Sequence, residues 1–250
     1  MSIRWQHHWI SPIVLWTSVI SAVVFVGCGG RRDPVETLSR DLARYPEFSL
    51  MLEDTRIQDG LSPDYFLRFR ILTAAGQKVD GRDTLVYSDR VTNWYEVGDG
   101  VFGRYENFVG MVVASKNREG RMTDVRQAHP PAYQYVGNSQ YGSWGGGGFW
   151  QFYGQYALMS HMMGGWRVGR NDYTDYRRNH ERGRPYYGPT EKGRSTFGSG
   201  GTVTEKTRPN FYRRQKQRLR SGGRNFSNRT QSRMGRSGSS WGRGSGFRGK

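Results

Sequence analysis

The chain has 250 residues and a formal net charge of +17 at neutral pH, from 38 Lys and Arg against 21 Asp and Glu. The excess charge lies at one end, since residues 176–250 hold 20 basic residues and 3 acids, whereas residues 1–175 hold 18 of each. Most aliphatic residues precede residue 127, which excludes a second large hydrophobic core. The single cysteine, Cys28, excludes an internal disulfide and a zinc site built from several cysteines.

The N-terminal region has the layout of an export signal. Arg4 precedes an uncharged apolar run from Trp9 to Cys28, and glycines follow at positions 29 and 30. A basic start, an apolar stretch and small residues at the cleavage point are typical of secretory signals. The sequence Phe25-Val26-Gly27-Cys28 resembles the signal of bacterial lipoproteins, in which the cysteine is lipidated and becomes the mature N-terminus. We therefore predict a signal peptide at residues 1–27, a lipidated Cys28 and a tether at residues 28–32.

An uncleaved membrane anchor is the alternative for this region. The apolar run is near the lower limit of about 17–25 residues that cross a bilayer, and four residues make it less apolar: Pro12, Thr17, Ser18 and Ser21. Under either hypothesis, the rest of the chain is expected outside the cytoplasm or at a membrane surface.

A helix is predicted directly after the tether. Asp33 is a suitable N-cap, Pro34 fits the first helical position, and Glu36 can bond back to the cap. Apolar residues then recur at helical spacing, at Val35, Leu38, Leu42 and Tyr45. Pro46 ends this helix, because the residue before a proline disfavours helical geometry.

Beyond Pro46 the apolar pattern changes to the period of two that is typical of strands. The predicted strands are Phe48–Leu52, Tyr65–Ile71, Thr84–Tyr87, Val91–Val97 and Phe108–Ala114, with Thr123–Arg126 as a short edge strand. One helix followed by four or five antiparallel strands indicates an α+β fold, with a small N-terminal helix plus an antiparallel sheet in a domain at residues 33–128.

Charged residues on the predicted strands indicate a polar sheet face. Arg68, Arg70, Glu53, Arg56 and Glu96 are expected to line a solvated face, and a ligand site is the alternative. The adjacent carboxylates Glu53 and Asp54 are expected to point to opposite faces of their strand, so they do not form a catalytic pair.

Residues 129–170 form a neutral segment rich in glycine, aromatic residues and methionine, without a Lys, Arg, Asp or Glu from Gln127 to Trp166. Between Phe149 and Met163, apolar residues fall near one face at helical spacing. Three interpretations remain open: a helix packed on the domain, a segment in the membrane interface, or a surface for a partner protein. The predicted contact residues are Phe149, Trp150, Phe152, Tyr153, Tyr156 and Trp166.

Residues 171–250 are dominated by Arg, Gly and Ser and keep no hydrophobic period, so we predict a largely disordered basic tail. Phe211–Leu219 is the one stretch expected to form a brief basic helix. The residues expected to bind an anionic ligand are Arg213, Arg214, Lys216, Arg218 and Arg220. Outside the cytoplasm such a tail meets anionic lipid or an acidic envelope polymer, and a solvated tail without a specific ligand is the alternative.

The sequence contains no motif for catalysis. The glycines at positions 145–148 lack the Lys-Ser pair of a phosphate-binding loop, and the serines lack the context of a nucleophile elbow. His161 lies near three methionines, which is too little for a soft-metal site. We therefore expect no enzymatic activity, no cofactor and no metal.

Several segments together resemble a group of uncharacterised bacterial lipoproteins: the signal ending in Cys28, the stretch Asp33–Ile71, Asn107–Met111, the aromatic run at 149–156, and Tyr186–Thr190 before an Arg/Gly/Ser-rich tail. This resemblance implies a location in the cell envelope, facing the periplasm or in the outer membrane, and implies no chemistry. The leading hypothesis is a lipid-anchored envelope protein with a non-enzymatic binding or scaffold role, whose partners are the membrane and an anionic lipid or polymer. The alternative is an uncleaved membrane-anchored protein whose Arg/Gly tail binds nucleic acid.

Overall fold

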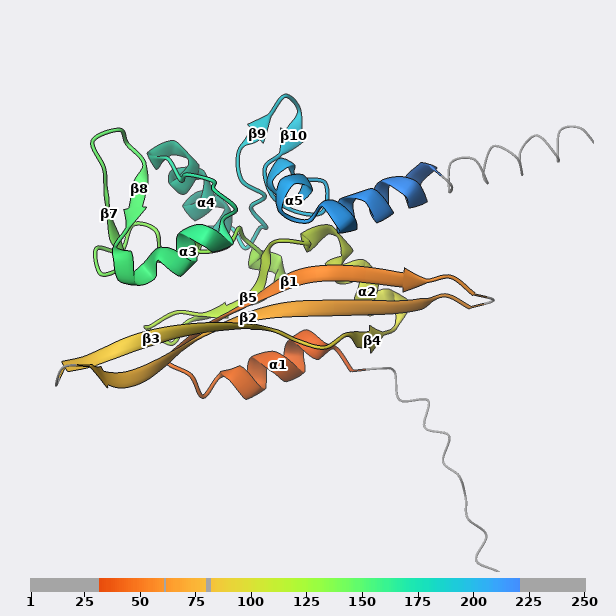
Figure 1. Cartoon of the computed structure of the whole chain (residues 1–250), viewed down its shortest axis with the longest axis horizontal. Helices are drawn as coiled ribbons and strands as arrows, with labels where there is room; N and C mark the ends of the chain where they lie inside the picture. Colours follow the sequence, from red (N-terminus) through yellow and green to blue (C-terminus); the bar gives the residue numbers. More distant parts are fainter. Residues whose placement is uncertain (1–31, 61, 80–81, 221–250) are drawn as a thin grey trace, which may run out of the picture. The chain divides into compact units, whose positions relative to one another are not determined.

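The computed structural model describes residues 32–60, 62–79 and 82–220 (Figure 1). Helices combine with a mostly antiparallel sheet, which confirms the predicted α+β class. Helix α1 lies on one face of the sheet, and residues 129–220, which we call the C-terminal layer, cover the other (Figure 1). The predicted signal peptide and Cys28 lie outside the described residues, as do residues 221–250.

Helix α1 (Pro34–Leu42) begins as the sequence predicts. Asp33 accepts a hydrogen bond from the Val35 amide at 2.9 Å, which caps the helix, and Pro34 occupies the first turn. The buried side chains are the four on one face: Pro34, Val35, Leu38 and Leu42. This face packs against strands β1 and β5.

One sheet contains six of the described strands, in the order β3-β2-β1-β5-β6 with β4 paired to β2. The pairings are antiparallel. The strands are β1 (Glu47–Gln58), β2 (Asp64–Val79), β3 (Arg82–Val91), β4 (Tyr95–Val97), β5 (Val112–Lys116) and β6 (Met122–Thr123).

The predicted strand Phe108–Ala114 is wrong in its first half. Helix α2 (Asp99–Tyr105) and a 3-10 turn, η1 (Glu106–Phe108), precede a bend at Gly110, and β5 starts only at Val112. Gly110 has φ +81°, a conformation that side chains disfavour, and a Cβ there would lie 3.0 Å from the Thr204 hydroxyl. Glycine at this position thus allows the C-terminal layer to approach the sheet.

Strand β1 is buried on both faces from Glu47 to Leu52. Its odd-numbered side chains contact the C-terminal layer: Tyr141 Oη donates to Glu47 Oε1 at 2.7 Å, and Gln134 Nε2 donates to Ser49 Oγ at 3.0 Å. Because strand side chains alternate, the even-numbered Phe48, Leu50 and Leu52 point to the face that α1 covers. The sheet is therefore covered on both sides, and the expectation of one solvated face is wrong along this part of β1.

The C-terminal layer consists of short elements joined by turns. They are η2 (Val125–Gln127) at its border, η3 (Tyr133–Tyr135), β7 (Gly142–Trp144), β8 (Trp150–Phe152), η4 (Gly154–Tyr156), α3 (Ala157–Met162), α4 (Arg170–Glu181), β9 (Thr190–Glu191), β10 (Arg194–Ser195), α5 (Thr202–Thr207) and a helix at 209–220. The single helix indicated by the spacing from Phe149 to Met163 is wrong, because the β7–β8 hairpin takes its first part.

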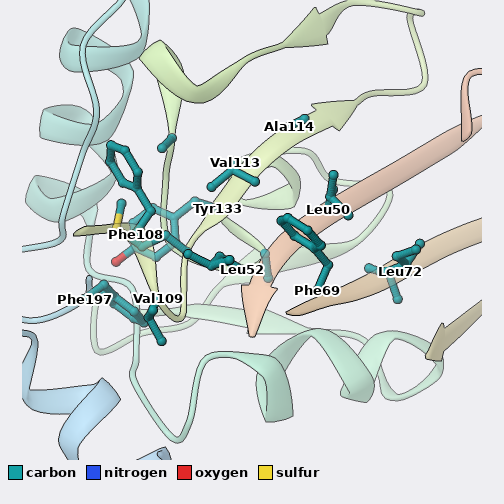
Figure 2. Packing of buried hydrophobic residues seen from close by; sticks show 14 of the residues in the cluster. Leu50, Leu52, Phe69, Leu72, Phe108, Val109, Val113, Ala114, Tyr133 and Phe197 are labelled. Atoms are coloured by element: carbon teal, nitrogen blue, oxygen red, sulfur yellow. The ribbon is translucent and has the colours of Figure 1, made fainter. Parts of the chain in front are cut away.

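The prediction of disorder is wrong for residues 171–220. The apolar residues of this part are isolated in the sequence, yet five of them are buried in the same core as the sheet: Tyr176, Tyr186, Phe197, Val203 and Phe211. Figure 2 shows Phe197 and Tyr133 in this core together with Leu52 of β1. A periodic pattern is missing because turns, rather than a long amphipathic element, bring these residues to the core.

Asp172 of α4 holds three parts of the C-terminal layer together. Its buried carboxylate accepts hydrogen bonds from Tyr133 Oη and Tyr186 Oη, both at 2.7 Å, and from Trp166 Nε1 at 3.1 Å. Buried polar groups require such partners, so this carboxylate and its donors specify how η3, α4 and the strand-like segment at 186 pack.

Asp172→Ala is expected to destabilise the fold by at least about 2 kcal/mol, because it leaves buried donors without their acceptor. Urea unfolding followed by circular dichroism measures the change. Asp175→Ala is the matched control, since Asp175 lies on the same helix in an exposed pair with Arg178, and it should change stability by less than about 0.5 kcal/mol. Equal effects of the two substitutions would contradict the role given to Asp172.

Candidate functional site

Helix 209–220 and the end of β1 enclose a cleft of about 510 Å³, which we call the arginine cleft. Three guanidinium groups line it, from Arg56 of β1 and from Arg214 and Arg218 of the helix. The other lining residues are Thr55, Ile57, Asp59, Phe102, Glu106, Phe211, Gln215 and Leu219. The charge of this lining is mixed, because Asp59 and Glu106 lie among the arginines and Arg214 pairs with Asp54.

Two neighbouring carboxylates of β1 hold the C-terminal residues 202–220 on the sheet. Arg208 Nη2 lies 2.8 Å from Glu53 Oε2, and Arg208 Nε donates to the Glu53 carbonyl at 2.9 Å. Arg214 Nη2 lies 2.6 Å from Asp54 Oδ1. Phe211 lies between these two arginines in the sequence and is buried. An ion pair to β1 therefore lies on each side of this apolar contact.

A β-bulge explains why Glu53 and Asp54 can both face this segment. The pairing of β1 with β2 shifts register between Leu52 and Asp54, so the strict alternation of side chains is interrupted there. The expectation that the two carboxylates point to opposite faces is therefore wrong. Each of these carboxylates also forms an ion pair with an arginine of β2: Glu53 with Arg70 at 3.1 Å, and Asp54 with Arg68 at 3.5 Å.

This network changes the titration of Glu53. Burial by itself raises the pKa of the Glu53 carboxyl, but the charges and hydrogen bonds of Arg208 and Arg70 outweigh it and lower the pKa below the ordinary value of 4.5. The charged carboxylate is thus the form that binds the C-terminal residues.

Arg56 is positioned by aromatic side chains. Its guanidinium lies 4.5 Å from the Phe66 ring centroid and 5.0 Å from that of Trp94, which also contacts Arg68 at 4.7 Å. Of the residues predicted for a solvated sheet face, Arg56, Arg68, Arg70 and Glu53 therefore belong to stacked or paired groups, and Glu96 is exposed on β4.

The five predicted anion-binding residues lie on two sides of helix 209–220. Arg214 and Arg218 are four residues apart and share the arginine cleft. Arg213, Lys216 and Arg220 are spaced by three and four residues, so they share a second, exposed face, which we call the basic face. Within the described part of the chain, these three residues make no ion pair.

Helix α2 contacts both the start of α1 and the arginine cleft. Asp33, which caps α1, accepts hydrogen bonds from Arg104 Nη1 at 2.8 Å and from Tyr105 Oη at 2.7 Å. Those donors belong to α2, and Phe102 of the same helix lines the cleft. The start of α1 and the arginine cleft are therefore connected through one short helix.

The six predicted contact residues do not form one surface. Trp150 and Tyr156 are buried in the core, and Phe152 and Trp166 are partly buried against it. Only Phe149 and Tyr153 are exposed, at 39% and 45%. Packing on the domain, one of the three interpretations of this segment, accounts for most of these side chains.

Burial keeps the side chain of His129 in its neutral form. His129 is completely buried, which lowers its pKa to about 4, so the ring is neutral at pH 7. Its Nδ1 bonds the Pro130 carbonyl at 2.8 Å.

Among the described side chains, no group of three His, Cys, Asp or Glu is arranged to hold a metal ion. In the same residues, no helix is both long enough and apolar enough to cross a bilayer.

No family model, curated protein or solved structure matches the chain.

Glu53→Gln is expected to loosen residues 202–220, because it removes the carboxylate that pairs with the partly buried Arg208 and leaves Arg70 paired with Asp89 alone. The loss of two charge-assisted contacts should cost about 1.5–3 kcal/mol. Hydrogen exchange followed by mass spectrometry measures it as faster exchange at residues 209–220. Glu119→Gln removes an exposed acid and should leave the exchange unchanged. Unchanged exchange in Glu53→Gln would contradict the docking role.

Acid is expected to release the same segment. Because the folded pKa of Glu53 is depressed, its contribution to stability is complete above the ordinary value near 4.5 and is lost as the pH falls through the lower folded pKa. Hydrogen exchange at pH 7 and at pH 3, with each rate divided by the intrinsic exchange rate at that pH, should show lower protection of residues 209–220 at pH 3. The acid effect should be smaller in Glu53→Gln, which has no carboxylate to protonate; an equal effect would assign the release to other groups.

Proposed function

We propose that this protein is a lipid-anchored, non-enzymatic protein of the bacterial cell envelope, which uses helix 209–220 to bind anionic lipid at the membrane that anchors it. Cys28, after the apolar run and Val26-Gly27, is the proposed lipidation site. The observation that carries the proposal is the spacing between this cysteine and the folded body.

The spacing restricts which surface is near the membrane. Asp33, the first capping residue of the fold, is five residues after Cys28, so the chain between them spans at most about 18 Å in any conformation. A lipid on Cys28 would therefore keep the start of α1 near the bilayer surface. Asp33 is bonded to α2, whose Phe102 lines the arginine cleft, so one short helix links the tethered start of the fold to the cleft beside helix 209–220.

The charge of the helix supports anionic lipid as its partner. Arg213, Lys216 and Arg220 on the basic face keep their charges unpaired among the described residues, and Leu219 on the same helix is 73% exposed. Each basic residue near an anionic bilayer contributes about 1 kcal/mol, which falls with salt. A lipid anchor combined with a polybasic surface is stronger than either attachment alone.

Neutralising the basic face is expected to weaken vesicle binding. The triple variant Arg213→Gln, Lys216→Gln, Arg220→Gln loses about 3 kcal/mol of attraction, so partition onto vesicles with one third anionic lipid should fall roughly a hundredfold at low salt. Sedimentation with vesicles measures it, using residues 29–250, which lack Cys28 and the apolar run before it, so that neither attachment masks the difference.

The matched control removes the same charge elsewhere, through Lys78→Gln, Arg90→Gln and Arg184→Gln, and should retain most of the binding. Equal losses in both triple variants would assign the attraction to net charge and contradict a role of the basic face. Preference for single-stranded oligonucleotide over anionic vesicles would favour the nucleic-acid alternative.

The anchor requires its own test. Wild-type and Cys28→Ser proteins should be compared in bacterial cells for incorporation of labelled fatty acid and for the mass of the N-terminus. Labelling of the wild type alone, with cleavage before Cys28, is the expected result. Retention of residues 1–27 without label in both proteins would overturn the lipid anchor.

A further inference from the structure

A second cleft, of about 690 Å³, lies within the C-terminal layer, and we call it the aromatic cleft. None of its lining residues belongs to the arginine cleft. They come from the end of the β7–β8 turn, from the segment before and within α4, and from the residue before β9: Gly148, Phe149, Gly165, Trp166, Arg167, Gly169, Arg170, Asn171, Asp172, Asp175 and Pro189. Its size falls within the range of about 300–1,000 Å³ that is usual for small-molecule sites.

Two exposed arginines are the cationic groups of this cleft. Arg167 stacks on Phe149, with its guanidinium carbon 4.6 Å from the ring centroid, and Arg170 stacks on Trp144 at 4.7 Å. Both side chains are exposed, and neither forms an ion pair with a carboxylate in the part of the chain that the structure describes. Stacking orients a guanidinium group while its N–H donors stay available for a ligand.

The acids of the cleft are already engaged. Asp172 accepts three hydrogen bonds from Tyr133, Tyr186 and Trp166. Asp175 pairs with Arg178 at 3.0 Å. Because both carboxylates have partners, the charged groups left to bind a ligand are the two guanidinium groups, which favour an anion.

Two aromatic side chains of the cleft, Phe149 and Trp166, indicate what the uncharged part of the ligand is. Phe149 is exposed to 39%, and it is held across from α4 by the backbone bridge between Phe149 and Gly169. Trp166 Nε1 is bonded to Asp172 and Tyr133, which fixes the indole ring in the wall. Rigid aromatic faces beside glycines accept a ring that presents a face of apolar C–H groups, and a sugar ring has such a face.

We propose that the aromatic cleft binds an acidic saccharide, with Phe149 and Trp166 against the face of a sugar ring and Arg167 and Arg170 on its carboxylate or phosphate group. A bidentate guanidinium contact suits either anion. This proposal does not depend on lipidation of Cys28 or on the basic face, so it can fail or hold independently of the proposed function.

Calorimetric titration of the full-length Cys28→Ser protein tests the site, with a tetrasaccharide of uronic acid as the probe. A neutral tetrasaccharide of the same linkage and inorganic phosphate are the comparison ligands. We expect the acidic saccharide to bind and the neutral one to bind at least tenfold more weakly. Inorganic phosphate should also bind more weakly, because it lacks the ring that the aromatic walls accept.

Variants then locate the binding. Arg167→Ala with Arg170→Ala should weaken the acidic saccharide roughly a hundredfold, about tenfold for each charge-assisted contact. Phe149→Ala should weaken both the acidic and the neutral saccharide, because the ring contact serves both. The matched control is Arg182→Ala with Arg184→Ala, which removes two exposed arginines outside the cleft and should leave affinity unchanged.

Four outcomes would overturn the proposal. They are no binding of the acidic tetrasaccharide, equal affinity for the neutral one, full competition by inorganic phosphate at the same concentration, and equal losses in the cleft and control variants. Circular dichroism of each variant shows whether it is folded, and Arg167→Gln with Arg170→Gln, which keeps the length of the side chains, should show the same loss of affinity if charge is the cause.

Discussion

The burial of β1 on both faces is the constraint on which the rest of the fold depends. On the face opposite α1, Glu47, Ser49 and Glu53 are polar and covered, so the C-terminal layer must supply their hydrogen-bonding partners. Burial raises the pKa of the Glu47 carboxyl, although hydrogen bonds from Tyr141 and Tyr87 lower it. The net increase shows that the C-terminal layer shields this carboxyl from water. The C-terminal layer is poor in aliphatic residues, yet it folds on the sheet because its tyrosines and arginines form hydrogen bonds and ion pairs with polar groups of β1.

The arginines of the described residues divide into groups with different physical roles. Arg208 and Arg214 are structural, because their charges are matched by carboxylates of β1. Arg213, Lys216 and Arg220 face outward from the same helix and offer their charges to a partner. Net charge alone therefore does not identify a binding surface. A basic side chain that is already paired with a carboxylate contributes to the fold, whereas an unpaired one can bind a partner.

The two clefts belong to different parts of the molecule. Phe102 of α2 lines the arginine cleft, and the same helix bonds Asp33 at the start of α1. The aromatic cleft lies between the β7–β8 hairpin and α4, among groups that hold the C-terminal layer together. Together the two proposals describe an envelope protein held at a lipid surface by one region and open to acidic saccharide at another.

The sequence by itself determined α1, the positions of β1, β2 and β3, and the α+β class, because caps, turns and the period of two are local signals. It also located a basic helix near Phe211–Leu219. Tertiary structure alone decided that residues 171–220 fold, because isolated residues such as Tyr176 and Phe197 become anchors only where turns bring them to the sheet. The bulge between Leu52 and Asp54 and the partners of Asp172 likewise depend on contacts between distant segments, and no local pattern reports those contacts.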